Sequence, residues 1–287
     1  MKCLILAAGY ATRLYPLTEN FPKPLLEVGK ATILDRLIDD IRDLTDEFVI
    51  ISNHKFAEQF RNYADAKIIA DFKKQAAAFT GSQEAYLSHF PAVPKAAKTA
   101  ADGSDDDSEN ASSKRLHITV LDDGTTSNET RLGAVKDIQF ALEELKIDEE
   151  CLVMAGDNVL DFSLADFVKY AKACGTSCVM CHEENSLKAL QKTAVITLDE
   201  DGLITSYEEK PQEPKGHHAV PPFYFYRAED ICRIPEALAD GCGFDAPGSF
   251  AAWLSSKTPM HAYVMPGKRY DIGDLESYRH VQEVFGK

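Results

Sequence analysis

Short apolar runs alternate with amphipathic segments through residues 1–180, and this alternation restricts the possible folds more than any other feature of the sequence. Met1–Ala8 is the first such run, and Cys151–Ala155 is another. A short run with apolar residues at nearly every position indicates a strand covered on both faces, as in a parallel sheet. Ile33–Leu44 follows a suitable N-cap residue, Thr32, and places its apolar residues on one helical stripe. The order of strands and helices predicts an α/β fold with a doubly wound, mostly parallel sheet.

The remaining segments extend this pattern and then change it. Further strands are expected at Phe48–Ser52, Ile118–Leu121 and Ser177–Met180, and further helices at Phe56–Tyr63, Leu132–Leu145 and Ser163–Cys174. After residue 190, the runs Ala194–Leu198 and Leu203–Glu208 flank Asp201-Gly202, which predicts a β-hairpin. Two more strands are expected at His218–Tyr226 and His261–Met265, and helices at Phe250–Ser255 and Leu275–Phe285. We therefore expect one catalytic domain over residues 1–287, with an antiparallel-rich C-terminal part.

One segment does not fit a packed core. Residues 91–114 read PAVPKAAKTAADGSDDDSENASSK and contain no aromatic residue and no apolar periodicity. Such a composition buries too little apolar area to offset the entropy of ordering the chain. We expect a disordered, solvated insert at 91–114; a regulatory or partner-binding insert is the alternative.

Charge and cysteine usage narrow the class of protein. The formal net charge is −15, and an acidic surface repels phosphate backbones, so no nucleic-acid partner is expected. No apolar run approaches about 18 residues and no signal-peptide pattern is present, which favours a cytoplasmic protein without a membrane partner. The seven cysteines are scattered, as is typical of reduced thiols. Cys178 and Cys181 have CxxC spacing, but a strand would point them to opposite faces, which argues against a metal site.

The loop after the first strand carries two cations. The sequence ILAAGYATRLYPLTENFPKPLL spans residues 5–26 and contains Arg13 and Lys23. Open parallel sheets bind ligands beyond the carboxyl ends of their strands, where this loop lies. Gly9 lets backbone N–H groups approach a phosphate closely, Arg13 offers a planar fork and Lys23 a point charge. The loop has neither the glycines of a dinucleotide fingerprint nor the GKS or GKT of a P-loop. It therefore predicts an anion-binding site of another kind.

This loop resembles the signature of the sugar-1-phosphate nucleotidyltransferases, the family that includes glucose-1-phosphate thymidylyl- and uridylyltransferases. That signature reads approximately L-A-(A/G)-G-x-(G/A)-T-R-L-x-P-L-T, followed by K-P-(L/M), and here it corresponds to Leu6–Thr18 and Lys23–Leu25. The resemblance implies a Rossmann-like nucleotidyltransferase fold and a reaction between a nucleoside triphosphate (UTP, dTTP or CTP) and a sugar-1-phosphate. It also implies Arg13 and Lys23 as catalytic residues. The nucleotide-binding residues implied are Ala8, Gly9, Arg13, Lys23 and Gly133.

Two aspartates complete the site that the resemblance implies. Asp157 directly follows a buried strand in Ala155-Gly-Asp-Asn158, at the same sheet edge as Arg13. Asp271 lies in a segment, 269–278, that resembles the family's W/Y-x-D-x-G-(T/D)-x-x-S-Y. In the family these two aspartates hold Mg²⁺ on the nucleotide phosphates. Mg²⁺ usually takes one or two carboxylates plus phosphate and water oxygens, so the resemblance implies Mg²⁺ held by Asp157 and Asp271.

A third motif points to the acceptor. Tyr207-Glu-Glu-Lys-Pro211 matches the family's E-K-P, in which the glutamate binds sugar hydroxyls and the lysine binds the sugar phosphate. Glu209 and Lys210 take these positions and are the implied sugar-phosphate-binding residues. Strict strand alternation would separate the two side chains, but Pro211 ends the strand and lets both turn toward one pocket.

The chain departs most from the family at residues 121–134. Many relatives read the base with L-G-T-(A/G)-G-A, whereas only Leu132-Gly133-Ala134 is kept here. Gly133 is expected against the base, with Asn128 or Arg131 as polar contacts. The resemblance therefore supports the reaction class better than the identity of the nucleotide.

Two other functions stay open. Related enzymes activate phosphocholine or phosphonates with CTP, and the aromatic run Phe223–Tyr226 could line a cage for a quaternary amine. A non-catalytic nucleotide-sugar-binding relative is the other, although such a protein needs no metal-binding pair. Relatives commonly form dimers or tetramers, so a homo-oligomer also stays open.

Overall fold

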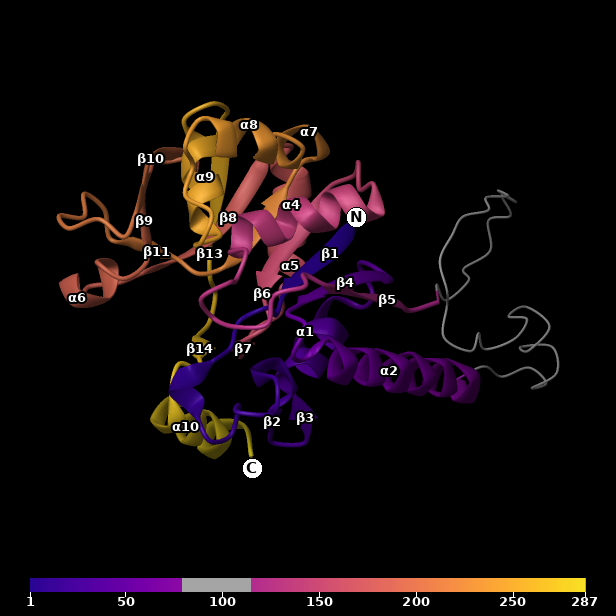
Figure 1. The fold of residues 1–287 in the computed structure, drawn as a ribbon. Helices are drawn as coiled ribbons and strands as arrows, with labels where there is room; N and C mark the ends of the chain where they lie inside the picture. The colour runs from indigo at the N-terminus through magenta and orange to yellow at the C-terminus, as the bar shows by residue number, and fades with distance from the viewer. Residues whose placement is uncertain (79–114, 287) are drawn as a thin grey trace.

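The computed structural model describes residues 1–78 and 115–286, so the expected insert at 91–114 lies outside the described residues. In the described part, a ten-stranded sheet runs in the order β10-β9-β11-β8-β12-β6-β1-β4-β5, with β13 beside β8 (Figure 1). Its strands are β1 (Lys2–Leu6), β4 (Glu47–Ser52), β5 (His117–Asp122), β6 (Cys151–Ala155), β8 (Ser177–Glu183), β9 (Ala194–Leu198), β10 (Ile204–Glu209), β11 (His218–Val220), β12 (Phe223–Tyr226) and β13 (Met260–Val264). Strands β6, β1, β4 and β5 are parallel neighbours, whereas β9, β10, β11 and β12 pair antiparallel. The predicted fold class is confirmed.

Helices and two small strand pairs surround this sheet. The small pairs are β2 (Glu27–Val28) with β3 (Ala31–Thr32), and β7 (Asn158–Leu160) with β14 (Arg269–Asp271). The helices are α1 (Ile33–Ile41), α2 (Ala57–Ala78), α4 (Ala134–Leu145), α5 (Ala165–Cys174), α6 (Leu187–Leu190), α7 (Ala228–Ile231), α8 (Ile234–Ala239), α9 (Gly248–Ser255) and α10 (Leu275–Phe285). None of these helices has both the length and the apolar character required to cross a membrane.

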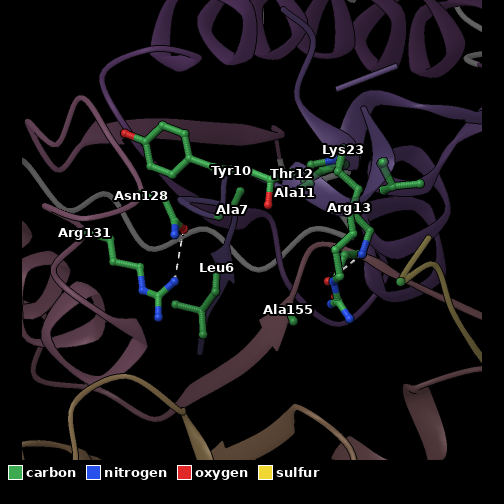
Figure 2. A pocket seen from close by; sticks show the side chains of 15 residues that line it. Leu6, Ala7, Tyr10, Ala11, Thr12, Arg13, Lys23, Asn128, Arg131 and Ala155 are labelled. Carbon is green, nitrogen blue, oxygen red and sulfur yellow. Dashed lines mark hydrogen bonds and ion pairs between the residues drawn. The ribbon is translucent and has the colours of Figure 1, made fainter. Parts of the chain in front are cut away.

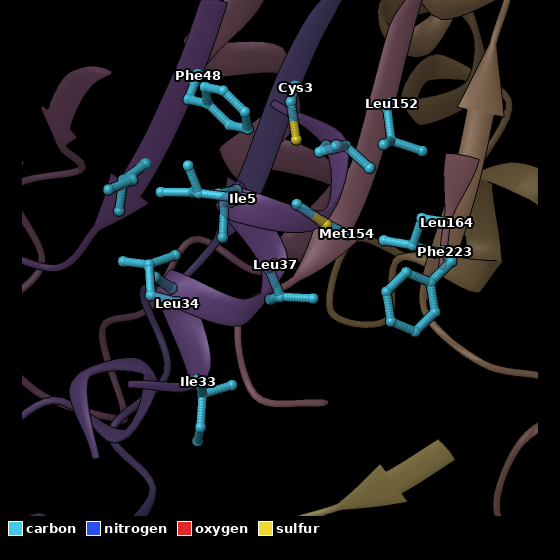
Figure 3. Packing of buried hydrophobic residues seen from close by; sticks show 14 of the residues in the cluster. Cys3, Ile5, Ile33, Leu34, Leu37, Phe48, Leu152, Met154, Leu164 and Phe223 are labelled. Atoms are coloured by element: carbon cyan, nitrogen blue, oxygen red, sulfur yellow. The ribbon is translucent and has the colours of Figure 1, made fainter. Parts of the chain in front are cut away.

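The sheet separates two hydrophobic cores. Alternate residues of β1 serve opposite faces, since Cys3 and Ile5 belong to one core and Leu4 to the other. Helices α1, α2 and α5 contribute to the first core, part of which Figure 3 shows, and α4, α8 and α9 contribute to the second. Because the centre of β1 is buried on both faces, its residues Cys3–Ile5 must be apolar, as the sequence predicted.

The CxxC pair follows the same alternation. Cys178 belongs to the first core and Cys181 to the second, so the two thiols lie on opposite faces of β8. Burial raises the pKa of each thiol to about 12. These cysteines are therefore protonated core residues and not a shared metal site.

The start of α1 is as predicted, whereas α2 is longer than predicted. Thr32 Oγ1 accepts a hydrogen bond from the Asp35 backbone N–H at 2.9 Å, and the Asp35 carboxylate accepts one from the Thr32 backbone N–H at 3.1 Å, forming a capping box. Helix α2 continues past Tyr63 to Ala78. Apolar periodicity is weak there, but Lys67 forms ion pairs with Asp35 and Asp39, both at 2.8 Å, which bind α2 to α1.

The aromatic segment expected as one strand is divided into two. Pro221 and Pro222 separate β11 from β12, because proline has no N–H to donate to a strand neighbour. All four aromatic residues of β12 are buried, with Phe223 and Phe225 in the first core and the two tyrosines in the second. They are core residues and do not line an exposed aromatic cage.

Candidate active site

A pocket of about 390 Å³ opens at the carboxyl ends of β1 and β6 (Figure 2). Six residues predicted from the sequence line it, among them Gly9, Arg13, Lys23 and Asp157. Asn128 and Arg131 line it too, which brings the 121–134 segment to the same cavity. The charged lining is Arg13, Lys23, Arg131 and Asp157. Three cations against one anion, in a chain of net charge −15, make this pocket a favourable place for an anionic ligand.

The loop after β1 has the backbone shape of a glycine-rich loop, although Ala11 stands where many relatives have glycine. Ala11 has φ 47° and ψ 40°, in the left-handed region that costs a non-glycine residue about 1–2 kcal/mol. Its carbonyl accepts hydrogen bonds from Thr18 Oγ1 at 2.8 Å and from the Leu14 N–H at 3.0 Å. Gly9 has open space where a side chain would stand. The loop is thereby held open for close approach of a ligand to its backbone.

A hydrogen-bonded chain joins three distant segments at the pocket. Lys23 is buried, with 8% of its surface exposed, and its Nζ lies 2.8 Å from Asp157 Oδ2. Asn158 Nδ2 donates to the other Asp157 oxygen at 2.7 Å. Asn158 Oδ1 in turn accepts from Arg269 Nη1 at 2.7 Å. The chain from Lys23 to Arg269 therefore fixes both oxygens of Asp157 and connects the loop after β1 to β14.

The two predicted metal ligands lie on paired elements. Asp271 is the register partner of Asn158 in the β7–β14 pair, so it is next to the turn that carries Asp157. In the ranges that the structure describes, no group of three or more His, Cys, Asp or Glu residues could hold a metal by itself. Asp157 lines the pocket and Asp271 lies on β14, the strand paired with β7, and Mg²⁺ takes one or two carboxylates together with phosphate and water oxygens. The residues present therefore fit this ion.

Glu209 and Lys210 lie outside the lining of this pocket but close to one another. Lys210 has φ 48°, so the backbone turns at the end of β10 and brings its Nζ 3.9 Å from Glu209 Oε1. Glu209 Oε2 is buried with no hydrogen-bond partner in the described part of the chain, and so is the Tyr207 hydroxyl. A Cβ atom at Gly248 would stand 2.3 Å from Glu209 Oε2, so only glycine leaves this carboxylate room. Burial raises the pKa of Glu209, and Lys210 partly opposes that shift.

The other predicted nucleotide-binding residues, Ala8 and Gly133, also lie outside the pocket lining. The Ala8 carbonyl accepts a hydrogen bond from Asn53 Nδ2 at 2.9 Å. Gly133 has φ 92°, and a Cβ there would stand 2.6 Å from the Phe244 carbonyl oxygen. The close approach of the 244–245 backbone therefore explains why this position needs glycine, and a contact with the base stays a prediction.

Sequence reasoning missed three polar residues that organise the site. Asn158 and Arg269 each adjoin a recognised motif, and their neighbours Asp157 and Asp271 were the signal that could have found them. Asp245 had no local signal, because it reaches Arg131 across 114 residues of sequence.

A buried carboxyl lies beneath the 121–134 segment. Asp137 of α4 is 6% exposed, and its Oδ1 has no hydrogen-bond partner among the described residues. Asp123 Oδ2 is likewise buried and unpartnered. Burial, and next the charge of Asp123, raises the pKa of Asp137 to about 7. Asp137 is thus a carboxyl that the fold keeps protonated below neutral pH.

The fold and the site define a Rossmann-like α/β protein with a cationic pocket at the carboxyl edge of its sheet. The profile of the nucleotidyl transferase family matches residues 2–285, and the chain belongs to this family. The resemblance to the sugar-1-phosphate nucleotidyltransferases is thereby confirmed.

Individual relatives are distant. The chain is 23% identical over 282 residues to a UTP–glucose-1-phosphate uridylyltransferase of Synechocystis sp., covering 97% of this chain and 61% of that protein. It is 24% identical over 276 residues to the UTP–glucose-1-phosphate uridylyltransferase AglF of Haloferax volcanii, covering 95% of this chain and 91% of that protein. A crystal structure of UDP-glucose pyrophosphorylase complexed with UDP-glucose covers 99% of this chain and 97% of its own, with a TM-score of 0.71 at 19% identity. That last likeness is one of fold alone.

We predict that Asp137→Asn removes a pH dependence of stability. Between pH 4 and 7 the unfolded chain ionises Asp137 while the folded protein keeps it protonated. The folded state then binds more protons, so the free energy of unfolding falls as pH rises, by about 1.4 kcal/mol per unit at most. Asparagine is neutral at every pH and lacks this loss. The stability of Asp137→Asn relative to wild type therefore rises up to pH 7 and is constant above it.

Urea unfolding at pH 5, 6, 7 and 8 measures this difference. Asp148→Asn, at an exposed aspartate, is the matched control and leaves the pH profile unchanged. A constant difference between Asp137→Asn and wild type across this range would contradict the assignment.

Proposed function

We propose that the chain transfers a nucleotidyl group from a nucleoside triphosphate to a sugar-1-phosphate, giving a nucleotide sugar and pyrophosphate. The observation that carries this proposal is the cationic pocket at the carboxyl edge of the sheet, which Asp157 lines, with Asp271 paired to its neighbour Asn158. The reaction brings two anions together, so the protein must neutralise and align them. A phosphate oxygen is already deprotonated at pH 7 and needs no general base. The proposed reaction therefore uses no general acid or base from the protein.

The triphosphate would bind along the loop after β1. Arg13 would donate its planar fork to the β- and γ-phosphates, and Lys23 would donate to the α-phosphate and the leaving oxygen. A phosphate oxygen would then replace Asp157 as the partner of Lys23. This exchange keeps the buried Lys23 ammonium neutralised at every stage.

Asp157 and Asp271 would hold Mg²⁺, which supplies charge neutralisation on the phosphates when it is bound. Asn158 would keep the Asp157 carboxylate oriented through its 2.7 Å hydrogen bond. Release of Asp157 Oδ2 from Lys23 would make that oxygen available as a ligand.

The acceptor would bind at the end of β10. Lys210 would hold the phosphate of the sugar, and the Glu209 carboxylate would accept hydrogen bonds from sugar hydroxyls. Oε1 is the carboxylate oxygen offered to these hydroxyls, because Oε2 is buried. A phosphate oxygen of the acceptor would form a bond to the α-phosphorus while the bond to the bridging oxygen breaks and pyrophosphate leaves.

A quaternary-amine acceptor has less support. The aromatic residues Phe223–Tyr226 are all buried in the two cores, where none of them can face a ligand cage. The metal-suited carboxylates argue against a non-catalytic sensor, which has no use for them.

Pyrophosphate release tests the proposed reaction directly. Each of UTP, dTTP, CTP, GTP and ATP is combined with several sugar-1-phosphates and with phosphocholine, with Mg²⁺ present. We expect release that depends on a sugar-1-phosphate and is absent with phosphocholine. Pyrophosphate release that occurs only with phosphocholine would refute the proposal. The absence of release with every acceptor in the matrix would refute it too.

The two lysines should separate in their kinetic effects. Loss of a charge-assisted phosphate contact costs about 1.5–3 kcal/mol, roughly ten- to a hundredfold. Lys210→Ala should raise the KM for sugar phosphate by this factor and leave the KM for nucleotide nearly unchanged. Lys23→Ala should lower kcat, because its contact is strongest in the transition state. Steady-state kinetics with each substrate varied in turn decide this, with the exposed Lys215→Ala as a control. A Lys210→Ala enzyme impaired only toward nucleotide would place the acceptor site elsewhere.

Asp271→Asn tests the metal ligands with little structural disturbance. Asp271 is exposed, so its loss should lower turnover at least a hundredfold and leave the melting temperature within about a degree. Asp157→Asn should in addition lower the melting temperature, since it leaves the buried Lys23 unpaired. Turnover and thermal melts over a Mg²⁺ series measure both effects, with the exposed Glu276→Gln as a control. Near-normal turnover of Asp271→Asn would remove it from the site.

A further inference from the structure

We propose that Arg131, held in place by Asp245, selects nucleotides whose base carries a ring carbonyl and rejects adenine. This inference rests on the proposed function only in that a nucleotide occupies the pocket. Figure 2 shows Arg131 and Asn128 on one side of the pocket and Arg13 and Lys23 on the other. If the phosphates bind at Arg13 and Lys23, the base end of the nucleotide faces Arg131.

Arg131 is fixed before any ligand binds. Its Nε and Nη2 each lie 2.9 Å from Asp245 Oδ1, and its Nη1 donates to Asn128 Oδ1 at 3.0 Å. A guanidinium with three of its five N–H donors engaged is oriented before a ligand arrives, so its two remaining donors have a set direction.

Asp245 is itself held by the start of α4. The Ala134 N–H donates to the Asp245 carbonyl at 3.2 Å, and the Val135 N–H donates to the Phe244 carbonyl at 2.9 Å. The Lys136 ammonium lies 4.3 Å from the centre of the Phe244 ring. These contacts join the 244–245 segment to the start of α4, next to the segment that reads the base in relatives. A residue from the C-terminal half of the chain thus positions a pocket side chain from the N-terminal half.

The wall that Arg131 and Asn128 form presents donors. A guanidinium has five N–H donors and no acceptor. Asp245 and Asn128 accept from three of these N–H donors. One N–H on Nη1 and one on Nη2 remain for a ligand. Asn128 Nδ2 has no partner among the residues that the structure describes, and its Oδ1 already accepts from Arg131. A base at this wall must therefore offer acceptors.

This requirement divides the nucleobases by their chemistry. Guanine offers O6 beside N7, cytosine offers O2 beside N3, and uracil and thymine offer carbonyl oxygens. Each of these carbonyl oxygens has two lone pairs and can accept from both free donors of Arg131. Adenine has no carbonyl oxygen: its ring nitrogens accept one hydrogen bond each, and N1 and N7 both lie beside the N6 amino donor, so one donor of Arg131 would stay unpaired. One well-placed guanidinium contact discriminates roughly ten- to a hundredfold between bases.

Equilibrium binding tests this selection without requiring turnover. Dissociation constants for ATP, GTP, UTP, CTP and inorganic tripolyphosphate are measured by calorimetry with the full chain. We expect wild type to bind at least one carbonyl-bearing nucleotide ten- to a hundredfold more tightly than ATP. Arg131→Ala should abolish that preference, and the loss of one pocket cation should weaken ATP and tripolyphosphate by one smaller, common factor. Asp245→Asn should reduce the preference in the same direction, and Arg131→Lys should restore part of it.

Other outcomes overturn the inference in distinguishable ways. Equal weakening of all ligands by Arg131→Ala, tripolyphosphate included, would make Arg131 a phosphate contact. An unchanged preference would make the Arg131–Asp245 pair purely structural. Arg233→Ala removes another arginine that pairs with a carboxylate and serves as the matched control. Base preference without pyrophosphate release would instead refute the proposed reaction and leave this inference standing.

Discussion

Burying a cation costs several kcal/mol unless an anion neutralises it, and Lys23 is such a cation. Its pairing with Asp157 therefore fixes the loop after β1 against the end of β6. Asn158 extends this constraint to Arg269 and so to β14. The same constraint gives the proposed reaction an order of events. A nucleotide phosphate that takes Lys23 also releases Asp157, so nucleotide binding and exposure of the carboxylate are one step in energetic terms.

The parallel sheet explains why these residues meet. Strands β4, β1 and β6 are parallel neighbours, so everything that follows them in sequence emerges at one edge. Arg13 and Lys23 follow β1, and Asp157 follows β6. An acidic surface elsewhere strengthens the consequence, because an anionic ligand is repelled from most of the molecule and stabilised at this edge. The fold thereby brings Arg13 and Lys23 together in one pocket.

Much of this could be predicted from sequence, because local patterns encode it. The strand β1, the Thr32 cap and the helix Leu275–Phe285 each follow from residues within a dozen positions of one another. The proximity of Arg13 and Asp157 could also be predicted, because the residues that follow two neighbouring parallel strands emerge at the same edge of the sheet. The β7–β14 pair did not, because it joins segments 113 residues apart through only three register pairs. The Arg131–Asp245 contact likewise depends on how the 244–245 segment packs on α4, which no local pattern records. Whether Glu209 and Lys210 serve the same ligand as Arg13 stays a prediction.

Backbone strain gives an independent indication of where function resides. In the described ranges, three non-glycine residues have positive φ: Ala11, Lys146 and Lys210. Lys146 ends helix α4, where a left-handed residue is ordinary. The other two lie in the loop after β1, proposed to bind the triphosphate, and in the proposed acceptor motif. Each is held by its surroundings: Thr18 bonds the Ala11 carbonyl at 2.8 Å, and the Lys210 N–H bonds the Thr193 carbonyl at 3.1 Å. Such strain persists only where the surrounding structure holds the backbone in place. At Ala11 and Lys210 it orients two segments that the packing of the cores does not require. Both turns are therefore shaped by contacts within the protein and are formed without a ligand.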